Sequence, residues 1–174
     1  MTQEKVCDFG NSLLAKIVAS TLYAEKHTEC QRKGVAALLI KVEKMQGEQF
    51  YPRIVLRDIN GPLPGVLCEG PDAVGSCGCG HAEPRLMLDM LGGGYHGNSP
   101  FIIATSYSPC TQCANIIAWV HAAGIIKGLV YGKLTEHDKR GLAHLQHIMP
   151  CYEAEELIVR PTAEHGKVIE EQWI

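Results

Sequence analysis

The sequence lacks the features that mark nucleic-acid-binding, membrane-spanning and exported proteins. Lysine and arginine number 16 against 19 aspartate and glutamate residues, so the formal net charge is −3 and no basic surplus suits a nucleic-acid-binding domain. No uncharged apolar run approaches the roughly 20 residues of a membrane-spanning helix. Polar residues 2–5 follow Met1, where a secretory leader would soon become apolar. We therefore expect a cytoplasmic protein without membrane attachment, and we disfavour long nucleic acids as partners.

The sequence combines an ordinary globular composition with an unusual number of cysteines. Its 174 residues are 46% hydrophobic, which predicts one domain over residues 1–174 with enough chain to bury a core. In the reducing cytoplasm, its 8 cysteines are more typical of metal ligands or catalytic groups than of disulfides.

The order of apolar patterns predicts an α/β fold. The predicted helices cover residues 11–27, 83–91, 111–123 and 138–147. The predicted strands cover residues 34–40, 53–57, 101–105, 127–131 and 157–159. A hairpin followed by alternating helices and strands indicates a layered fold whose sheet is partly parallel. The long segment 58–80 is rich in glycine and proline, and a loop of this length inside a domain usually has a function.

Two short motifs carry the chemistry. The first places His81 and Glu83 two residues apart where this loop meets a helix, and the second places Cys110 and Cys113 three apart after Pro109. One imidazole and two thiolates suit a catalytic zinc ion, which keeps three protein ligands and leaves a fourth position for water. Glu83 would then be free to move protons. A structural zinc site and two unrelated elements are the alternatives.

The predicted start of the third helix would assist metal binding. Ser108 and Pro109 suit the N-cap and the first helical position. Cys110 and Cys113 would then lie in the first turn, on one face of the helix. The helix dipole favours the thiolate form there, and the thiolate is the form that binds a metal.

With these motifs the sequence resembles the cytidine deaminase superfamily, and most of all its deoxycytidylate (dCMP) deaminase branch. The resemblance runs from about residue 22 to residue 131, and its main segments are 30–37, 59–68 and 108–113. It implies a three-layer α/β/α fold with a five-stranded mixed sheet. It also implies zinc at His81, Cys110 and Cys113, with Glu83 as the catalytic residue. Ile59 and Pro84 depart from the pattern of the branch.

The resemblance further implies a substrate and an assembly. We expect a dCMP-like small nucleotide as substrate, with Asn60 contacting its sugar, and a homo-oligomer. From the residues alone, Asn60-Gly61 is equally a turn pair, while Tyr107 and Tyr131 are better interpreted as core residues. The alternatives are a deaminase of another small base (a nucleoside, a 5-substituted cytidylate or guanine), a nucleic-acid-editing deaminase, and a zinc-binding scaffold without turnover.

Four more cysteines, Cys30, Cys68, Cys77 and Cys79, form a second candidate set. Some dCMP deaminases carry a second, structural zinc in this region, and four thiolates make a closed tetrahedral site. Four independent reduced thiols are the alternative.

Three cations flank these segments. Arg32, Lys33 and Arg57 are each able to reach a substrate phosphate, to which they would donate charge-assisted hydrogen bonds. For each of them taken alone, a solvated surface charge is the better interpretation, and the sequence does not show which one would reach the phosphate.

Overall fold

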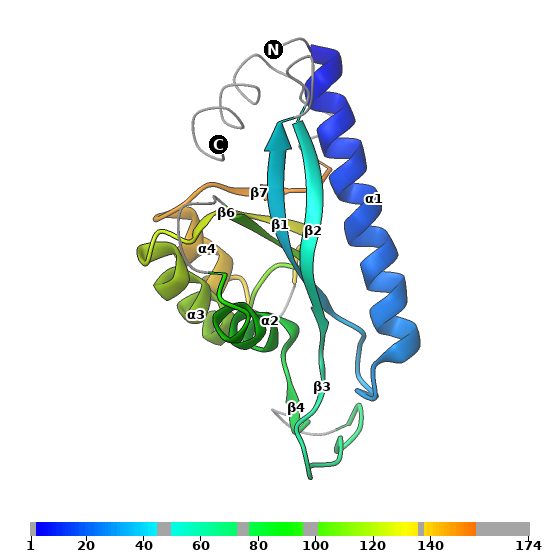
Figure 1. The fold of residues 1–174 in the computed structure, drawn as a ribbon. Helices are drawn as coiled ribbons and strands as arrows, with labels where there is room; N and C mark the ends of the chain where they lie inside the picture. The colour runs from blue at the N-terminus through cyan, green and yellow to red at the C-terminus, as the bar shows by residue number, and fades with distance from the viewer. Residues whose placement is uncertain (1–2, 45–49, 73–76, 96–100, 136–137, 156–174) are drawn as a thin grey trace.

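A central sheet organises the residues that the computed structural model describes, which are 3–44, 50–72, 77–95, 101–135 and 138–155 (Figure 1). The helices of these ranges are α1 (Gln3–His27), α2 (Ala82–Gly92), α3 (Thr111–Ala122) and α4 (Arg140–Gln146). The strands of the sheet are β1 (Ala36–Lys44), β2 (Phe50–Ile59), β5 (Phe101–Tyr107), β6 (Ile126–Lys133) and β7 (Cys151–Glu153). A separate two-stranded ribbon pairs β3 (Gly61–Pro62) with β4 (Cys79–Gly80).

The sheet is mixed, with the strand order β2-β1-β5-β6-β7. Strand β1 runs antiparallel to both β2 and β5, whereas β5, β6 and β7 run parallel to one another. The predicted hairpin is the β1–β2 pair, and each parallel pair is joined by a crossover that contains a helix. The predicted five-stranded mixed sheet is confirmed.

Helices cover both faces of the sheet. On one face, α1 packs Leu13 and Ile17 against Leu38 and Ile40 of β1. The next residues along β1 point to the opposite face, where they join the core that α2, α3 and α4 build. Because both faces are covered, the middle of β1 is apolar at every position, which explains why the sequence shows a continuous run there instead of an alternation.

The structure extends or replaces some predicted elements. Helix α1 begins at Gln3, eight residues before its predicted start, and the 58–80 loop contains the β3–β4 ribbon. The predicted strand over residues 157–159 lies outside the described residues. The outer strand beside β6 is β7, which the sequence analysis did not predict.

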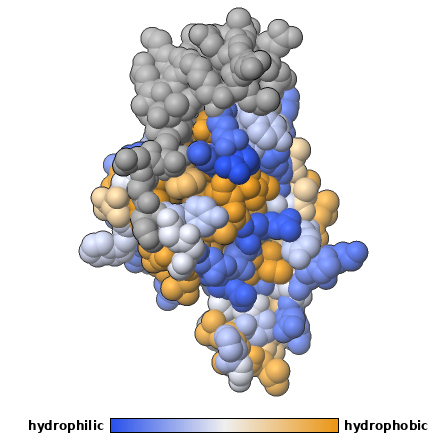
Figure 2. Space-filling view, in the orientation of Figure 1, coloured by the Kyte–Doolittle hydropathy of each residue, from blue (hydrophilic) through white to orange (hydrophobic). Residues whose placement is uncertain are grey.

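The segment around the ribbon projects from the lower end of the molecule (Figures 1 and 2). It carries the exposed apolar side chains Leu63, Val66 and Leu67. Within the described residues, no helix combines the length and the apolar character needed to cross a membrane.

Candidate active site and metal-binding clusters

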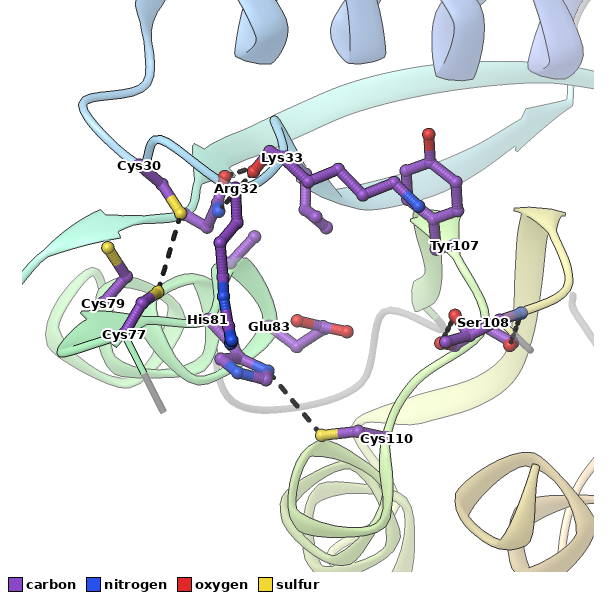
Figure 3. Close-up of a pocket in the computed structure, with 14 residues that line it drawn as sticks. Cys30, Arg32, Lys33, Cys77, Cys79, His81, Glu83, Tyr107, Ser108 and Cys110 are labelled. Atoms are coloured by element: carbon purple, nitrogen blue, oxygen red, sulfur yellow. Dashed lines mark hydrogen bonds between the residues drawn. The ribbon is translucent and has the colours of Figure 1, made fainter. Parts of the chain in front are cut away.

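A pocket of about 270 Å³ lies beyond the carboxyl end of β5, where α2 and α3 begin (Figure 3). In open α/β sheets, ligands usually bind beyond the carboxyl ends of the strands, at a topological switch point. The pocket is lined by residues from several elements, including Lys33, Asn60, His81, Glu83, Tyr107 and Cys110. Segments far apart in the sequence therefore meet in one cavity.

His81, Cys110 and Cys113 converge at this pocket. The Nδ1 atom of His81 lies 3.6 Å from the sulfur of Cys110 and 3.3 Å from the sulfur of Cys113. The three atoms all lie within 4.8 Å of one another. A tetrahedral zinc ion with ordinary bond lengths would separate its nitrogen and sulfur ligands by about 3.6 Å. The structure thus brings the three predicted ligands together at the spacing that a metal ion requires.

The starts of two helices position these ligands. His81 is the N-cap residue of α2, and Cys110 is the N-cap residue of α3 with Cys113 in its first turn. The predicted helix start at residue 111 is confirmed, but the N-cap is not Ser108, which lies before the helix and accepts a hydrogen bond from the Thr135 N–H. The positive ends of both helix dipoles therefore converge on the three ligands, which favours thiolate there.

The segment before α4 fixes the start of α3. The Asp138 carboxylate accepts hydrogen bonds from the backbone N–H and the hydroxyl of Thr111, at 2.8 and 3.0 Å. Gly141 of α4 packs against the backbone of Cys110, and a Cβ at this position would lie 2.6 Å from the Cys110 carbonyl oxygen. The position therefore excludes any side chain.

The thiols and the imidazole influence one another's protonation. Hydrogen bonding from Cys113 lowers the pKa of Cys110 to about 4 and raises that of Cys113 itself. Hydrogen bonding with Cys110 raises the pKa of His81. Cys110 is therefore the sulfur that carries the negative charge most readily.

Glu83 lies in the first turn of α2, beside the three ligands (Figure 3). Only 4% of the residue is exposed. Burial raises the pKa of its carboxyl group, and hydrogen bonds from its own backbone N–H and from Cys113 offset the rise only in part. A buried carboxyl with a raised pKa in a pocket is typical of a catalytic acid or base.

The second set of cysteines also assembles. The sulfurs of Cys30, Cys68, Cys77 and Cys79 all lie within 4.8 Å of one another, and those of Cys30 and Cys77 are 3.8 Å apart. A tetrahedral ion with ordinary zinc–sulfur bonds would separate its sulfur ligands by about 3.8 Å. We call these residues the four-cysteine cluster, and they fit a closed metal site.

Backbone N–H groups already stabilise negative charge in the four-cysteine cluster. Hydrogen bonding from the Gln31 N–H lowers the pKa of Cys68 to about 7. Burial alone would raise the pKa of Cys30, but the backbone N–H groups of Lys33 and Arg32 bring it below its ordinary value. Cys30 and Cys68 are thus the members of the cluster that favour thiolate, whereas burial raises the pKa of Cys79.

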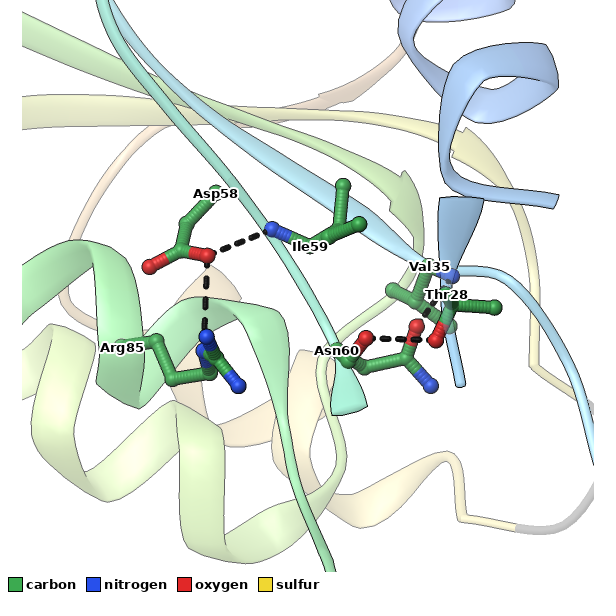
Figure 4. A network of polar contacts seen from close by, with 6 residues as sticks. All are labelled: Thr28, Val35, Asp58, Ile59, Asn60 and Arg85. Atoms are coloured by element: carbon green, nitrogen blue, oxygen red, sulfur yellow. Dashed lines mark hydrogen bonds and ion pairs between the residues drawn. The ribbon is translucent and has the colours of Figure 1, made fainter. Parts of the chain in front are cut away.

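Asn60 is buried at the pocket and holds the neighbouring loop (Figure 4). Its side-chain oxygen accepts a hydrogen bond from the Val35 N–H at 2.8 Å, and its side-chain nitrogen donates one to the Lys33 carbonyl at 2.7 Å. Its own carbonyl accepts a third from the Thr28 hydroxyl, at 2.6 Å. Asn60 therefore positions the backbone of residues 33–35, and its predicted contact with a sugar stays a prediction.

The three cations and two tyrosines that the sequence analysis considered lie in different surroundings. Arg32 and Lys33 line the pocket, whereas Arg57 lies over the ring of Tyr23 on α1, 4.1 Å from its centroid. Tyr131 is buried in the core as predicted. Tyr107 is not a core residue as predicted, because it lies half-buried against the pocket. The position of Tyr107 directly before Ser108, Pro109 and Cys110 is the sequence feature that could have identified it as a site residue.

The close packing of Gly141 yields a stability prediction. The variant Gly141→Ala should lose about 1–3 kcal/mol of unfolding free energy, because its methyl group would displace the Cys110 backbone. Urea unfolding measures the loss. Gly92→Ala is the matched control, since a Cβ there has no atom within 4 Å, and it should retain wild-type stability or gain slightly. Equal urea midpoints for Gly141→Ala and wild type would contradict the packing.

Comparison with known proteins finds likeness in structure alone. No protein-family model and no curated protein sequence matches the chain. The structure is similar to a dCMP deaminase from the cyanophage S-TIM5 in complex with dCMP and dUMP, with a TM-score of 0.58 and 20% identity over 80% of this chain and 93% of that one. It is also similar to the Rib2 deaminase of Aspergillus oryzae in complex with DARIPP, with a TM-score of 0.56 and 15% identity over 92% of this chain and 96% of that one. The chain thus has the cytidine deaminase-like fold that its sequence predicted.

Proposed function

We propose that the chain is a zinc-dependent hydrolytic deaminase that converts a dCMP-like nucleotide into the uridylate and ammonia. The observation that carries the proposal is the convergence of His81, Cys110 and Cys113 at metal-ligand spacing, with the buried Glu83 beside them in an open pocket. The fold shared with the cyanophage dCMP deaminase, whose structure holds dCMP and dUMP, supports this choice of substrate.

The three ligands are well suited to a catalytic zinc ion. Two sulfurs and one imidazole nitrogen would hold the ion and would leave one of its four positions for water. Zinc in such a site acidifies water and so supplies a nucleophile at neutral pH. The lowered pKa of Cys110 favours the thiolate that the ion needs.

Glu83 would carry the protons of the reaction. Hydrolysis forms a bond between water oxygen and the ring carbon that bears the amine, and breaks the bond from that carbon to nitrogen. Glu83 accepts one proton of the water and delivers it to the neighbouring ring nitrogen. It then transfers the second proton to the departing amine, which leaves as ammonia while the carbonyl forms. One carboxyl with a raised pKa suits both directions of transfer.

The four-cysteine cluster would hold a second, structural zinc ion. Its four sulfurs occupy all four tetrahedral positions and leave none for water or substrate. The ligands come from the turn after α1, the loop after β3, and β4 with the residues before it. A metal ion there would tie these segments together, and its binding energy would contribute to folding.

The first prediction from this proposal concerns metal content. Protein purified without added metal should contain close to two zinc ions per chain, as measured by elemental analysis. The double variant Cys68→Ser/Cys79→Ser should contain close to one, because two of the four thiolates are gone. Cys151→Ser is the control, since Cys151 belongs to neither set of ligands, and it should keep both ions. One ion per chain in both the wild type and the double variant would rule out the second site.

Glu83 gives the second prediction. Glu83→Gln should keep its zinc and its fold but lose turnover by a factor on the order of 10²–10⁴ or more, because the amide cannot accept and return protons. Ammonia release at saturating substrate measures turnover, and elemental analysis measures zinc. Asp89→Asn makes the same chemical change on the exposed side of α2 and should leave the rate unchanged. Near wild-type turnover by Glu83→Gln with full zinc would exclude the assigned role.

The third prediction tests the proposed reaction. Ammonia release should be fastest with dCMP or its 5-methyl analogue, and slow with guanine, single-stranded DNA and tRNA. The pocket suits a small molecule, and the net charge of −3 does not favour a polyanion. Activity confined to an oligonucleotide would show that the substrate is a nucleic acid and not a small nucleotide. Zinc-loaded protein that released ammonia from none of these compounds would refute the proposal.

A further inference from the structure

The first turn of α2 begins at His81 and contains Glu83, yet its own backbone holds it weakly. His81, the N-cap residue, makes no side-chain cap hydrogen bond. Pro84 has no N–H that a neighbouring group could hold. The first helical hydrogen bond, from the Arg85 N–H to the His81 carbonyl, is 3.5 Å long, whereas such bonds are ordinarily about 2.9–3.0 Å. The position of this turn therefore depends on contacts outside the helix.

The side chain of Arg85 makes such a contact with the end of β2 (Figure 4). Its Nε atom lies 3.4 Å from Oδ1 of Asp58, and only 15% of the Asp58 side chain is exposed. Burial raises the pKa of Asp58, while the Ile59 N–H and the charge of Arg85 act in the opposite direction. Because a partly desolvated carboxylate is costly without a counter-charge, this ion pair matters more than a fully exposed one.

The same side chain lies beside the base of the β3–β4 ribbon. A Cβ atom on Gly61 would lie 3.6 Å from Nη1 of Arg85, and one on Gly80 would lie 3.7 Å from its Cδ. Gly80 directly precedes His81. Arg85 therefore packs against the segment that enters α2 as well as against the strand that ends beside the helix.

The location of this cation within α2 needs an explanation, because the helix dipole disfavours positive charge in a first turn. Successive residues of a helix are about 100° apart, so Glu83 and Arg85 point to nearly opposite sides of α2. Glu83 is buried at the pocket, while Arg85 reaches β2. An anchor on the side opposite Glu83 resists the rotation of the turn that would move the carboxyl group away from the metal ligands.

The strand end that holds Arg85 is itself fixed (Figure 4). Asn60 lies two residues after Asp58, and its side chain accepts a hydrogen bond from the Val35 N–H. Its carbonyl accepts another from the Thr28 hydroxyl. The ion pair consequently joins the first turn of α2 to a firmly held part of the sheet and not to a free loop.

We infer that Arg85 is a positioning residue for the proposed reaction, because its ion pair with Asp58 fixes the first turn of α2 and thereby the direction of Glu83. The inference rests on the proposed function and adds to it a group outside the pocket, which Arg85 does not line. Its effect therefore passes through the helix and not through contact with the substrate.

Steady-state kinetics of zinc-loaded variants test this role. Arg85→Met keeps an alkyl stem beside Gly80 and removes the charge, so kcat with dCMP should fall about threefold to tenfold, the range that a partly buried ion pair supports. KM should stay within about twofold of wild type, since Arg85 does not contact the substrate. Arg85→Lys restores the charge and should recover part of the loss.

A double-mutant cycle shows whether Arg85 acts through Asp58. Asp58→Asn keeps the acceptor for the Ile59 N–H and removes the charge, so it should lower kcat to a similar extent. The double variant should be no slower than the slower single variant, because both changes remove one interaction. Wild-type kcat in Arg85→Met, or losses that multiply in the double variant, would overturn the inference.

Arg53→Met is the matched control. Arg53 also lies on β2 and forms an ion pair, with Glu43 at 2.8 Å, but both of these side chains are more exposed than Arg85 and Asp58. The pair lies toward the other end of the β1–β2 hairpin. Arg53→Met should therefore keep wild-type kcat and KM.

Hydrogen–deuterium exchange separates this inference from the proposed function, because it requires no turnover. The exchange rate of the peptide that spans residues 81–88 reports how firmly the first turn of α2 is held. Exchange should be at least about twofold faster in Arg85→Met and Asp58→Asn than in zinc-loaded wild type, and unchanged in Arg53→Met. This result would support the anchor even in a protein that released no ammonia. Unchanged exchange in Arg85→Met would overturn it, whatever the activity.

Discussion

The convergence of two helix N-termini on one point is the constraint on which the rest of the site depends. His81 begins α2 and Cys110 begins α3, so the ligand distances are set by the relative placement of two helices on one face of the sheet. The common core beneath these helices fixes that placement. Asp138 then fixes the loop that ends at Cys110 by accepting a hydrogen bond from the Thr111 N–H. Gly141 contributes because its missing side chain leaves room for the Cys110 backbone. A metal site built on packed helices is more rigid than one built on loops.

The burial of Glu83 has an energetic consequence. A carboxylate removed from water is costly, and the raised pKa of Glu83 expresses that cost. An apolar side chain at position 83 would pack more favourably. Leu86 and Met90 are such buried apolar residues, one and two turns further along α2. The fold therefore tolerates a destabilising group at the position where the proposed chemistry would need one, an arrangement that is common in catalytic sites.

The sequence predicted the helices and site residues that depend on local pattern, and it missed the features that depend on contacts between distant residues. Helical spacing located the main helices, and the two motifs located His81, Glu83, Cys110 and Cys113, which the structure brings together. Strand β7 has only three residues, too few to show a period. The N-cap of α3 was wrongly assigned to Ser108, because the acceptor for the Thr111 N–H is Asp138, 27 residues away, and no local rule reveals it.

The pocket and the four-cysteine cluster share a stretch of backbone, so a metal ion in the cluster would influence the wall of the pocket. The backbone N–H groups of Arg32 and Lys33 donate to the sulfur of Cys30, while their side chains line the pocket. On the other side, Cys79 lies two residues before His81. The ribbon that bears Cys79 has only two residues in each strand and projects from the molecule with exposed apolar side chains, so it lacks a core of its own. Cross-linking by a metal ion would replace that missing core. Loss of the ion would consequently loosen the pocket wall at Arg32 and Lys33 and the His81 ligand together.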